Sequence, residues 1–272
     1  MKPFYNMLKI VTSSYYHDQI QRFVAPLNDL LGINHFWYYK ITSSGHYVYL
    51  GSHSSWNEYC FDKSMISNFS CLRHPSLIPS GINLMQACPV GKYKQVLDAA
   101  WDKFQINFNI NLTKKIPEGI EAFGFASRFN DPYAEQRLLN ELPLLHHFTK
   151  MFRTKFSKLF RMIDEHPIDL PSQFGSVFYE NSREPVIPIK RDQFLRKIGL
   201  ESILTLTPRE IDVAKWIANG YPASYIAQQL QLNKRTVENY IVAIKDKLSC
   251  SSKVELIQKA QEIVAFNIPE MY

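Results

Sequence analysis

The segment from residue 206 to residue 248 constrains the fold of this chain more than any other. Its sequence, LTPREIDVAKWIANGYPASYIAQQLQLNKRTVENYIVAIKDKL, contains three short stretches with the apolar spacing of amphipathic helices, separated by tight turns. In the third stretch, Val237, Ile241, Ile244 and Leu248 fall on one side of a helix, and the other side is mostly polar. We therefore expect a small helical domain whose third helix has one buried face and one exposed face.

Local signals mark where these helices begin and end. Thr207-Pro208-Arg209-Glu210 has the pattern of a capping box with proline at the first helical position. Gly220 is suited to end the first helix, Pro222 to open the second, and Asn233 to cap the third. The boundaries indicated by the turns thus agree with those indicated by the apolar spacing.

A fourth helix is expected after Ser251 or Ser252, either of which can cap it. Its apolar residues cover an arc wider than one packed face needs: Val254, Leu256, Ile257, Ala260, Ile263 and Val264. One side can pack on the domain, and the remaining side is available to a partner helix. We therefore expect a homodimer contact here.

The third helix suits insertion into the major groove of DNA. A helix reached through a short turn, apolar inside and polar outside, has the required shape. Its start brings backbone N–H groups and Lys234 or Arg235 to where a phosphate would lie. The alternative is an ordinary helical bundle with no role in DNA binding, because spacing alone does not establish groove binding.

The segment closely resembles the LuxR-type helix-turn-helix family. The matching motifs, in chain order, are Leu206-Thr207-Pro208-Arg209-Glu210, Ala218-Asn219-Gly220, Ile226-Ala227-Gln228-Gln229-Leu230, Thr236-Val237 and Lys247-Leu248. The resemblance implies binding to double-stranded DNA, with the positions of Glu238, Asn239 and Val242 approaching base edges. The full set expected to contact DNA is Lys234, Arg235, Thr236, Glu238, Asn239, Val242 and Lys245.

Three departures from the family pattern concern DNA recognition. The family commonly has Ser-Asn at Pro222-Ala223, Lys at Glu238 and His at Tyr240. The carboxylate of Glu238 would repel phosphate, but it can accept a hydrogen bond from the N4 amino group of cytosine. We therefore expect the DNA sequence read by this chain to differ from the family's common one.

The size and composition of the chain indicate two domains. It has 272 residues, of which 46% are hydrophobic, and its net charge is +6. No apolar run reaches the ~18–20 residues of a membrane span, and the first residues do not have the pattern of a signal peptide. We therefore expect a cytoplasmic protein that does not enter a membrane. The four cysteines are too few for a disulfide framework.

The N-terminal part alternates between helical and strand patterns. Helices are expected at 13–31 and 91–106, a hairpin around Ser43-Ser44-Gly45, and strands at 82–87, 107–112 and 120–127. A long helical stretch from about 132 to 164 must bend or restart at Pro143. The prolines beyond His166 indicate a linker, with a short helix at 191–198. The expected domains are residues 1–165, a linker at 166–205, and the helix-turn-helix domain at 206–267.

This order of elements resembles the autoinducer-binding sensor domains that are fused to LuxR-type modules. The resemblance implies an α+β fold class, with an α-β-α sandwich akin to PAS and GAF folds preceding the all-α four-helix domain. A phospho-receiver is excluded because Asp18 and Asp29 lie on the first helical pattern rather than after an early strand. Trp56 falls in the region where the sensor family has a pocket tryptophan, and Phe123-Gly124-Phe125-Ala126 resembles its last strand.

The sensor resemblance does not extend to the family's ligand. Cys60 stands where the family has a tyrosine, and His74-Pro75 falls where it has Asp-Pro. That aspartate holds the amide N–H of an acyl-homoserine lactone, which a histidine could not do in the same way. We therefore expect a different small apolar ligand, or none.

The residues expected to bind such a ligand are Tyr47, Trp56, Tyr59, His74 and Trp101. Two alternatives remain open: the aromatic residues fill the sheet core, or the domain binds a protein partner or only dimerises. A zinc site at Cys71-x-x-His74 lacks a second ligand pair, so we expect no metal and no cofactor. We also expect no enzymatic activity, because no nucleophile–base pair, paired carboxylates or glycine-rich phosphate loop stands out.

Overall fold

The computed structural model describes residues 14–265 except 64, 70, 86–90 and 181–190. The chain divides into two compact units, Met1–Ser182 and Arg183–Tyr272. Each has its own cluster of buried apolar residues, and each is described by itself below. Among the described residues, none of the helices is both long enough and apolar enough to cross a membrane.

The N-terminal unit is built on a six-stranded antiparallel sheet with the order β3-β4-β5-β1-β2-β6. Its strands are β1 (Ile33–Thr42), β2 (His46–Gly51), β3 (Gly81–Leu84), β4 (Ile106–Ile116), β5 (Gly119–Arg128) and β6 (Ile168–Asp169). The predicted hairpin is confirmed as β1–β2, with Gly45 at a φ of +87° in its turn. The other three expected strands correspond to β3, β4 and β5.

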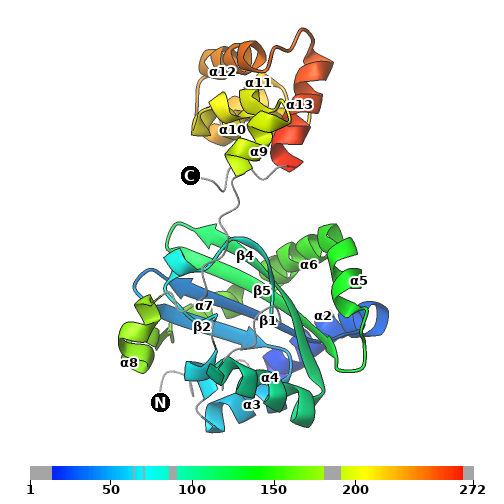
Figure 1. Cartoon of the computed structure of the whole chain (residues 1–272), viewed down its shortest axis with the longest axis vertical. Helices are drawn as coiled ribbons and strands as arrows, with labels where there is room; N and C mark the ends of the chain where they lie inside the picture. The colour runs from blue at the N-terminus through cyan, green and yellow to red at the C-terminus, as the bar shows by residue number, and fades with distance from the viewer. Residues whose placement is uncertain (1–13, 64, 70, 86–90, 181–190, 266–272) are drawn as a thin grey trace. The chain divides into compact units, whose positions relative to one another are not determined.

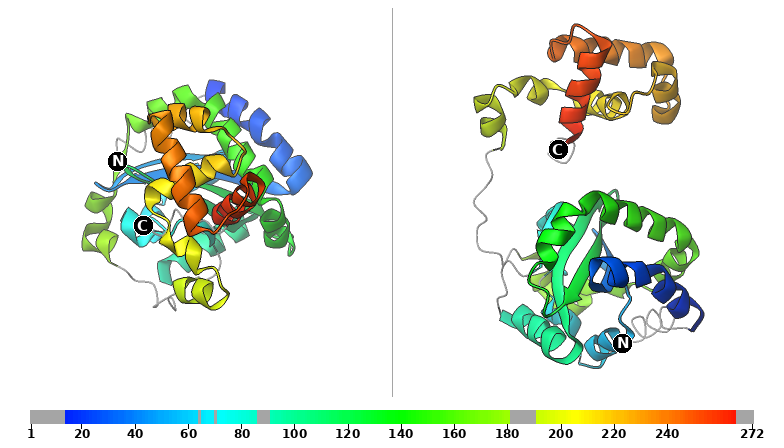
Figure 2. Two further views of the ribbon diagram at one scale, coloured as in Figure 1. Left: turned by 90° about the horizontal axis from the view of Figure 1, so that it is seen from above. Right: turned by 90° about the vertical axis from the view of Figure 1, so that its right-hand side faces the viewer.

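Helices cover both faces of this sheet (Figures 1 and 2). The elements on one face are α2 (Ser14–Leu31), α5 (Ala134–Asn140), α6 (Leu142–Lys155) and α7 (Ser157–Asp164). The opposite face carries α3 (Ser54–Asp62), α4 (Gly91–Phe104) and the short 3₁₀ turns η1 (Met65–Asn68) and η2 (Pro75–Leu77). The expected α-β-α sandwich is therefore confirmed.

The single helical stretch expected at 132–164 is three helices. Its first break lies at Glu141, directly before α6, and Pro143 falls in the first turn of that helix, where a missing N–H costs nothing. The restart near Pro143 is thus confirmed. The second break, at Phe156, separates α6 from α7 and was not expected, because Phe156 continues the apolar stripe into a buried position.

Alternation along β1 divides its aromatic side chains between the two layers. Phe36 and Tyr38 pack against the α6–α7 layer, with ring centroids 4.8 Å from Phe152 and 4.7 Å from Phe160 respectively. Trp37 and its neighbour Tyr39 face the α3–α4 layer instead. One set of alternate side chains of β1 therefore fills the core against the α6–α7 layer, and the other set can line a cavity on the opposite face of the sheet.

Part of the expected linker belongs to the N-terminal unit. β6 pairs with β2 through His46–Asp169 and Tyr47–Ile168, and α8 (Leu170–Phe174) and η3 (Gly175–Tyr179) follow it. Leu170 and Phe178 are fully buried in the core of this unit. Pro171 lies in the first turn of α8 rather than in an extended tether, so a linker beginning at residue 166 starts too early. The short helix expected at 191–198 is present as α9 (Arg191–Lys197).

The C-terminal unit contains the four helices expected from the sequence. After η4 (Glu201–Thr205) come α10 (Pro208–Ile217), α11 (Ala223–Leu230), α12 (Lys234–Lys247) and α13 (Lys253–Ala265). The capping box at Thr207 is complete: Glu210 N–H donates to Thr207 Oγ1 at 3.3 Å, and Thr207 N–H donates to Glu210 Oε2 at 2.6 Å. Most of the residues that the apolar spacing assigned to the interior, such as Ile211 and Val237, are buried, and Leu230 and Ile241 are partly buried.

Candidate functional site

Helix α12 begins at a well-defined cap. The side-chain oxygen of Asn233 accepts hydrogen bonds from the backbone N–H of Thr236 at 2.7 Å and from its hydroxyl at 2.9 Å. The turn before it contains Gln231 in the left-handed conformation, at a φ of +53°. This turn and cap set the direction in which α12 leaves α11, as a helix-turn-helix requires.

The inner face of α12 is anchored in the core. Val237, Ile244 and Leu248 are buried, and Ile241 is partly buried, on the side that the sequence predicted. At the end of the helix, Lys247 Nζ donates to Glu210 Oε2 at 2.7 Å and to the backbone oxygen of Thr205 at 3.1 Å. Because Val237 near the start of α12 is buried in the core and Lys247 at its end is hydrogen-bonded to Glu210 and Thr205, the outer face of α12 is held in a fixed direction.

The carboxylate of Glu210 is almost completely buried, with 4% of the residue exposed. Burial alone would raise its pKa, but hydrogen bonds from Lys247 and from the backbone and side chain of Thr207 lower the pKa below its ordinary value. Glu210 is therefore ionised at neutral pH and joins the capping box of α10 to the C-terminal end of α12.

The outer face of α12 and its flanks carry the seven residues expected to contact DNA. Lys234, Arg235, Glu238, Asn239 and Val242 are exposed, whereas Thr236 and Lys245 are partly buried. Val242 is 56% exposed, which leaves an apolar group among polar ones. Such a surface offers charged, amide and methyl groups together, and these are the groups that contact phosphates, base edges and the thymine methyl.

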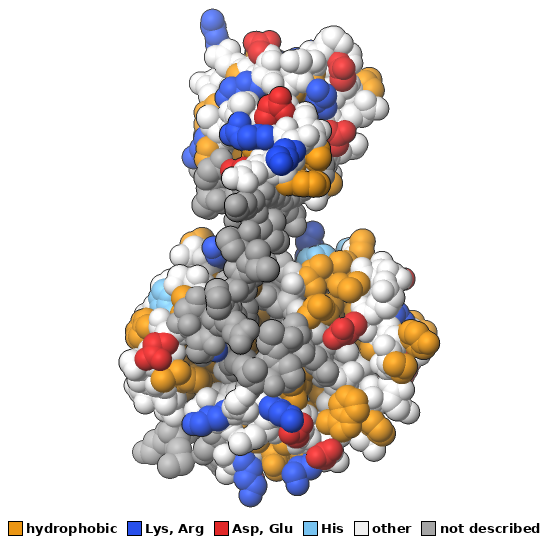
Figure 3. Space-filling view, in the orientation of Figure 1, with side chains coloured by type: hydrophobic (Ala, Val, Ile, Leu, Met, Phe, Trp, Pro, Cys, Tyr) orange, Lys and Arg blue, Asp and Glu red, His pale blue; other side chains and the backbone are white. Residues whose placement is uncertain are grey.

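The unusual acid on this face is not an isolated charge. Glu238 Oε1 lies 3.4 Å from Lys234 Nζ, one helical turn earlier. Figure 3 shows the wider pattern, in which Lys and Arg side chains on the visible face of the C-terminal unit are interspersed with Asp and Glu. The visible face of the unit is therefore mixed rather than uniformly basic.

Helix α13 leaves apolar side chains exposed, as its wide apolar arc predicted. Leu256, Ala260 and Ile263 are buried in the unit, whereas Val254 is 66% exposed and Val264 is 40% exposed. The two exposed valines lie on the helix that the sequence assigned to contact with a second copy of the chain. Isolated exposed valines are common on protein surfaces, so a dimer through this helix stays a prediction.

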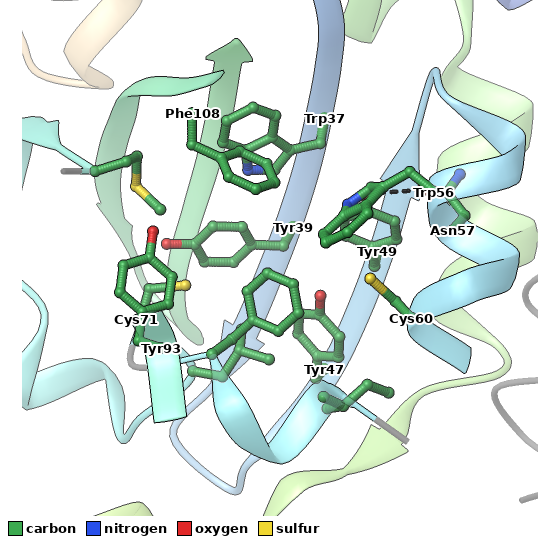
Figure 4. A pocket seen from close by; sticks show the side chains of 14 residues that line it. Trp37, Tyr39, Tyr47, Tyr49, Trp56, Asn57, Cys60, Cys71, Tyr93 and Phe108 are labelled. Carbon is green, nitrogen blue, oxygen red and sulfur yellow. Dashed lines mark hydrogen bonds between the residues drawn. The ribbon is translucent and has the colours of Figure 1, made fainter. Parts of the chain in front are cut away.

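A second site lies in the N-terminal unit, between the sheet and the α3–α4 layer (Figure 4). The cavity has about 610 Å³ of empty space, including space open to solvent, and the centres of water-sized molecules can occupy about 50 Å³ of it. Its lining is Trp37, Tyr39, Tyr47, Tyr49, Trp56, Asn57, Cys60, Ile66, Phe69, Cys71, Leu72, Met85, Tyr93 and Phe108. The cavity is thus narrow and mainly aromatic.

The structure brings together only part of the predicted ligand site. Tyr47 and Trp56 line the cavity. Tyr59 lies behind Trp56, its ring stacked at a centroid distance of 6.1 Å, and is not part of the lining. His74 and Trp101 lie elsewhere. His74 packs beside the Phe178 ring at 5.8 Å, and Trp101 is 42% exposed against Phe129.

Sequence reasoning missed the residues that complete the cavity, including Tyr93, Cys60 and Cys71. Tyr93 lies on the buried stripe of α4, while Trp101 on the same helix falls at the edge of the stripe. The helical spacing of Tyr93, Val96 and Ala100 was visible in the sequence and could have favoured Tyr93 over Trp101. The apolar spacing of α4 does not indicate, however, which turn of this helix lies over the cavity.

The cavity wall is electrically neutral. No Asp, Glu, Lys, Arg or His belongs to its lining among the described residues. Burial raises the pKa of the Tyr47, Tyr49, Tyr93 and Cys60 side chains, so these groups also stay protonated near neutral pH. Binding within this wall must therefore rely on apolar contact and on hydrogen bonds between uncharged groups.

Two of the polar groups in the wall are paired with each other. Asn57 Oδ1 accepts a hydrogen bond from Tyr49 Oη at 3.0 Å, and Asn57 Nδ2 donates to the backbone oxygen of Gly51 at 2.9 Å. A Cβ on Gly51 would overlap both side chains, so the absence of a side chain there permits this arrangement. The Asn57–Tyr49 pair holds the first turn of α3 against β2.

The possible zinc ligands do not form a cluster. Within the described ranges, no group of three or more His, Cys, Asp or Glu side chains is arranged to hold a metal ion. Cys60 and Cys71 line the aromatic cavity, whereas His74 Nδ1 lies 2.7 Å from the hydroxyl of Ser76 at the start of η2. Cys88, the remaining candidate, lies outside the described residues.

Comparison with known proteins identifies the C-terminal unit. Residues 204–260 match the family of bacterial regulatory proteins described as the luxR family. Transcriptional activator protein ExaE of Pseudomonas putida is 47% identical over 57 residues, which are 21% of this chain and 27% of that protein. The quorum sensing-dependent transcriptional regulator VjbR of Brucella abortus is 36% identical over 66 residues, 24% of this chain and 26% of that protein.

The solved structure of SdiA from Escherichia coli aligns over 96% of this chain and 95% of its own, with a TM-score of 0.36 and 12% sequence identity. This overall likeness is low, and the sequence matches span only about a quarter of ExaE and VjbR. The family assignment therefore rests on the C-terminal match: this chain carries a LuxR-family helix-turn-helix domain at its C-terminal end.

Proposed function

We propose that this protein is a DNA-binding transcriptional regulator in which α12 enters the major groove. The observation that carries the proposal is the exposed face of α12, anchored at both ends within a LuxR-family domain. Lys234 and Arg235 contact phosphates, while Glu238, Asn239 and Val242 approach base edges. Thr236 and Lys245 flank this face and contact the backbone. The protein acts by binding rather than by catalysis, in the cytoplasm, where bacterial DNA lies.

The N-terminal unit in this proposal binds a small, largely apolar molecule. The cavity between the sheet and the α3–α4 layer supports this over a domain that only meets a protein partner, because a fully packed core would leave no such space. The regulator acts as a homodimer through α13, and occupancy of the cavity changes how two copies of α12 meet successive turns of DNA.

Salt-dependent DNA binding tests the phosphate contacts. We expect the combined K234A and R235A substitutions to weaken binding to all DNA sequences and to reduce the slope of log affinity against log salt by about 2. The matched control is Lys215→Ala, which removes a cation on α10 whose Nζ lies 3.2 Å from Asp212. An unchanged slope in the double variant, or an equal reduction in the control, would contradict the proposed contacts.

Selection of bound sequences from a random DNA pool tests base reading. We expect Asn239→Ala to relax the sequence preference at one or two positions, because a good side-chain contact with a base contributes about 1–3 kcal/mol of discrimination. Overall affinity for unrelated DNA should change little. An equal loss of affinity on every sequence, with the preference unchanged, would remove Asn239 from base reading.

A further inference from the structure

His53 caps the start of α3 with its imidazole ring. The backbone N–H of Trp56 donates to His53 Nδ1 at 3.2 Å, and the backbone N–H of Asn57 donates to the His53 carbonyl oxygen at 3.1 Å. These are the bonds of an N-cap residue, a position where the acceptor is usually an oxygen of Asn, Asp, Ser or Thr. A histidine can lose this role, because a proton on Nδ1 removes the acceptor and places a positive charge at the unfavourable end of the helix dipole.

A second histidine lies beside this cap, in the core. His35 is 1% exposed, and its ring meets that of His53 edge-on at a centroid distance of 6.1 Å. Its Nδ1 lies 3.3 Å from Ser52 Oγ, which accepts a hydrogen bond from the backbone N–H of Phe36 at 2.9 Å. Its Nε2 is buried and has no hydrogen-bond partner among the described residues. A protonated imidazole needs an acceptor at both nitrogens, so a proton on His35 leaves a buried charge without one.

The two rings lie in aromatic surroundings. His35 stacks on Trp37 of β1 at 5.3 Å and meets Phe108 of β4 at 6.2 Å, while His53 meets Phe104 of α4 at 5.8 Å. Stacking on Trp37 compensates a cation only in part for the hydration that it loses. Burial lowers the pKa of His35 well below its ordinary value, and the nearby His53 lowers that pKa further. Burial also lowers the pKa of His53.

No acid is paired with either ring within the described ranges. Helix α2 reaches this region through Gln21, whose side chain donates to the backbone oxygen of Ser52. The charged or titratable side chains near these contacts along the packed helices are His17, Asp18 and Arg22 on α2, Glu58 on α3, and Asp102 and Lys103 on α4. None of the ion pairs among the described residues includes His35 or His53. A proton taken up at either ring therefore meets no compensating charge.

We propose that His35 and His53 form an acid-sensitive latch on the first turn of α3. Near neutral pH both rings are uncharged and the cap is made. When both rings are protonated, the cap is lost, two like charges lie at the 6.1 Å spacing of the rings, and the first turn of α3 loosens. Protons bind these rings more weakly in the folded unit than in the unfolded chain, so stability is complete above the ordinary histidine pKa of about 6.5 and falls as the pH drops below it.

The latch holds a helix that belongs to the cavity wall. Trp56 and Asn57, whose backbone N–H groups make the two cap bonds, both line the cavity. Loss of the cap therefore alters the wall at these residues, and acid becomes a second input to the N-terminal unit. This last step rests on the proposed function, whereas the latch itself depends on neither a ligand nor DNA.

Hydrogen–deuterium exchange of the full chain, without ligand or DNA, tests the latch between about pH 7.5 and about pH 5.5, a range that spans histidine titration. Exchange rates are corrected for their intrinsic dependence on pH. We expect protection of the first turns of α3 to fall roughly tenfold more than that of the β4–β5 hairpin. His53→Asn keeps a capping oxygen that does not titrate, so it should retain most of this protection at the lower pH.

His46→Asn is the matched control, because His46 is exposed at the start of β2. It should lose protection of α3 as the natural chain does. An equal loss in His53→Asn would overturn the role of the cap, and a loss that is absent, or of the same size throughout the N-terminal unit, would overturn a local latch.

NMR titration of the histidine ring protons in the natural chain tests the latch without any substitution. Midpoints of His35 and His53 below that of the exposed His46, with α3 opening over the same pH range, would support the latch. Ordinary midpoints for both rings while α3 stays protected would overturn it, even if His53→Asn fails to fold.

Discussion

Gly124 on β5 lies directly opposite Trp37 on β1. Replacing Gly124 by alanine should therefore displace the Trp37 ring, which lines the cavity. A Cβ at position 124 would come well within 3.0 Å of the Cε2, Cζ2 and Nε1 atoms of the Trp37 indole. Because three atoms of one ring are affected together, the whole ring must move. Trp37 is 5% exposed and packs edge-on against Phe108, so it can move only by compressing its neighbours or entering the cavity.

The expected change in the free energy of unfolding follows from two opposing effects of Gly124→Ala. Overpacking a well-packed core lowers the free energy of unfolding by ~1–3 kcal/mol. Replacing glycine restricts the unfolded chain, which raises the free energy of unfolding by ~0.4–1 kcal/mol. We expect Gly124→Ala to lower the free energy of unfolding by about 1–2 kcal/mol. For a unit of this length, Met1–Ser182, that is a fall in Tm of roughly 2–8 °C.

The assay is thermal and urea unfolding followed by tryptophan fluorescence and circular dichroism, applied as a double-mutant cycle with Trp37→Phe. The smaller ring has no counterpart of Cζ2, one of the three atoms nearest the new Cβ, so Gly124→Ala should cost less in the Trp37→Phe background. An equal cost in both backgrounds, or no cost in the natural chain, would refute the assignment of Gly124 to the Trp37 contact.

Two further predictions concern Glu210 and the tyrosines of the cavity. Because contacts with Lys247 lower the folded-state pKa of Glu210 below its ordinary value of 4.5, its stabilising contribution is present above that pH and is lost as the pH falls through the folded-state value. Glu210→Gln should therefore cost about 1–3 kcal/mol at pH 7 and flatten the acid limb of the stability curve of the C-terminal unit; an acid limb as steep as that of the natural chain would count against this linkage. Tyr93→Phe should leave the stability of the ligand-free chain unchanged or raise it slightly, because the buried Tyr93 hydroxyl has no hydrogen-bond partner among the described residues. Tyr49→Phe, which removes the hydrogen bond to Asn57 at 3.0 Å, should instead cost about 1 kcal/mol. Urea unfolding measures both, and equal losses in the two variants would contradict the difference in their hydrogen bonding.

Short-range signals account for most of what could be predicted from the sequence. The capping box at Thr207 and the cap at Asn233 depend on residues three positions apart, so their geometry is contained in the local sequence. The exposed and buried faces of α12 follow in the same way from helical spacing. The exposed and buried positions of α12 could for this reason be predicted from the sequence, whereas the DNA contacts assigned to them stay a prediction.

The cavity could be predicted only in part, because it depends on contacts between distant segments. The sequence indicates that β1 and β2 are aromatic, but not that Tyr47 and Trp56 line the same cavity as Tyr93, between the sheet and the α3–α4 layer. His74 was placed in the site through a family correspondence. The structure shows its ring beside Phe178 instead, and Phe178 belongs to the segment that was expected to be a linker. The pairing of β6 with β2 brings that segment back to the sheet, and a two-residue strand leaves little trace in the sequence.

The most direct test of the central claim is a structure of the full chain bound to a DNA duplex selected from a random pool. The account predicts α12 in the major groove, with Asn239 and Val242 within contact distance of base edges and with Lys234 or Arg235 at a phosphate. A complex in which DNA contacts another surface, and the outer face of α12 stays in solvent, would contradict it.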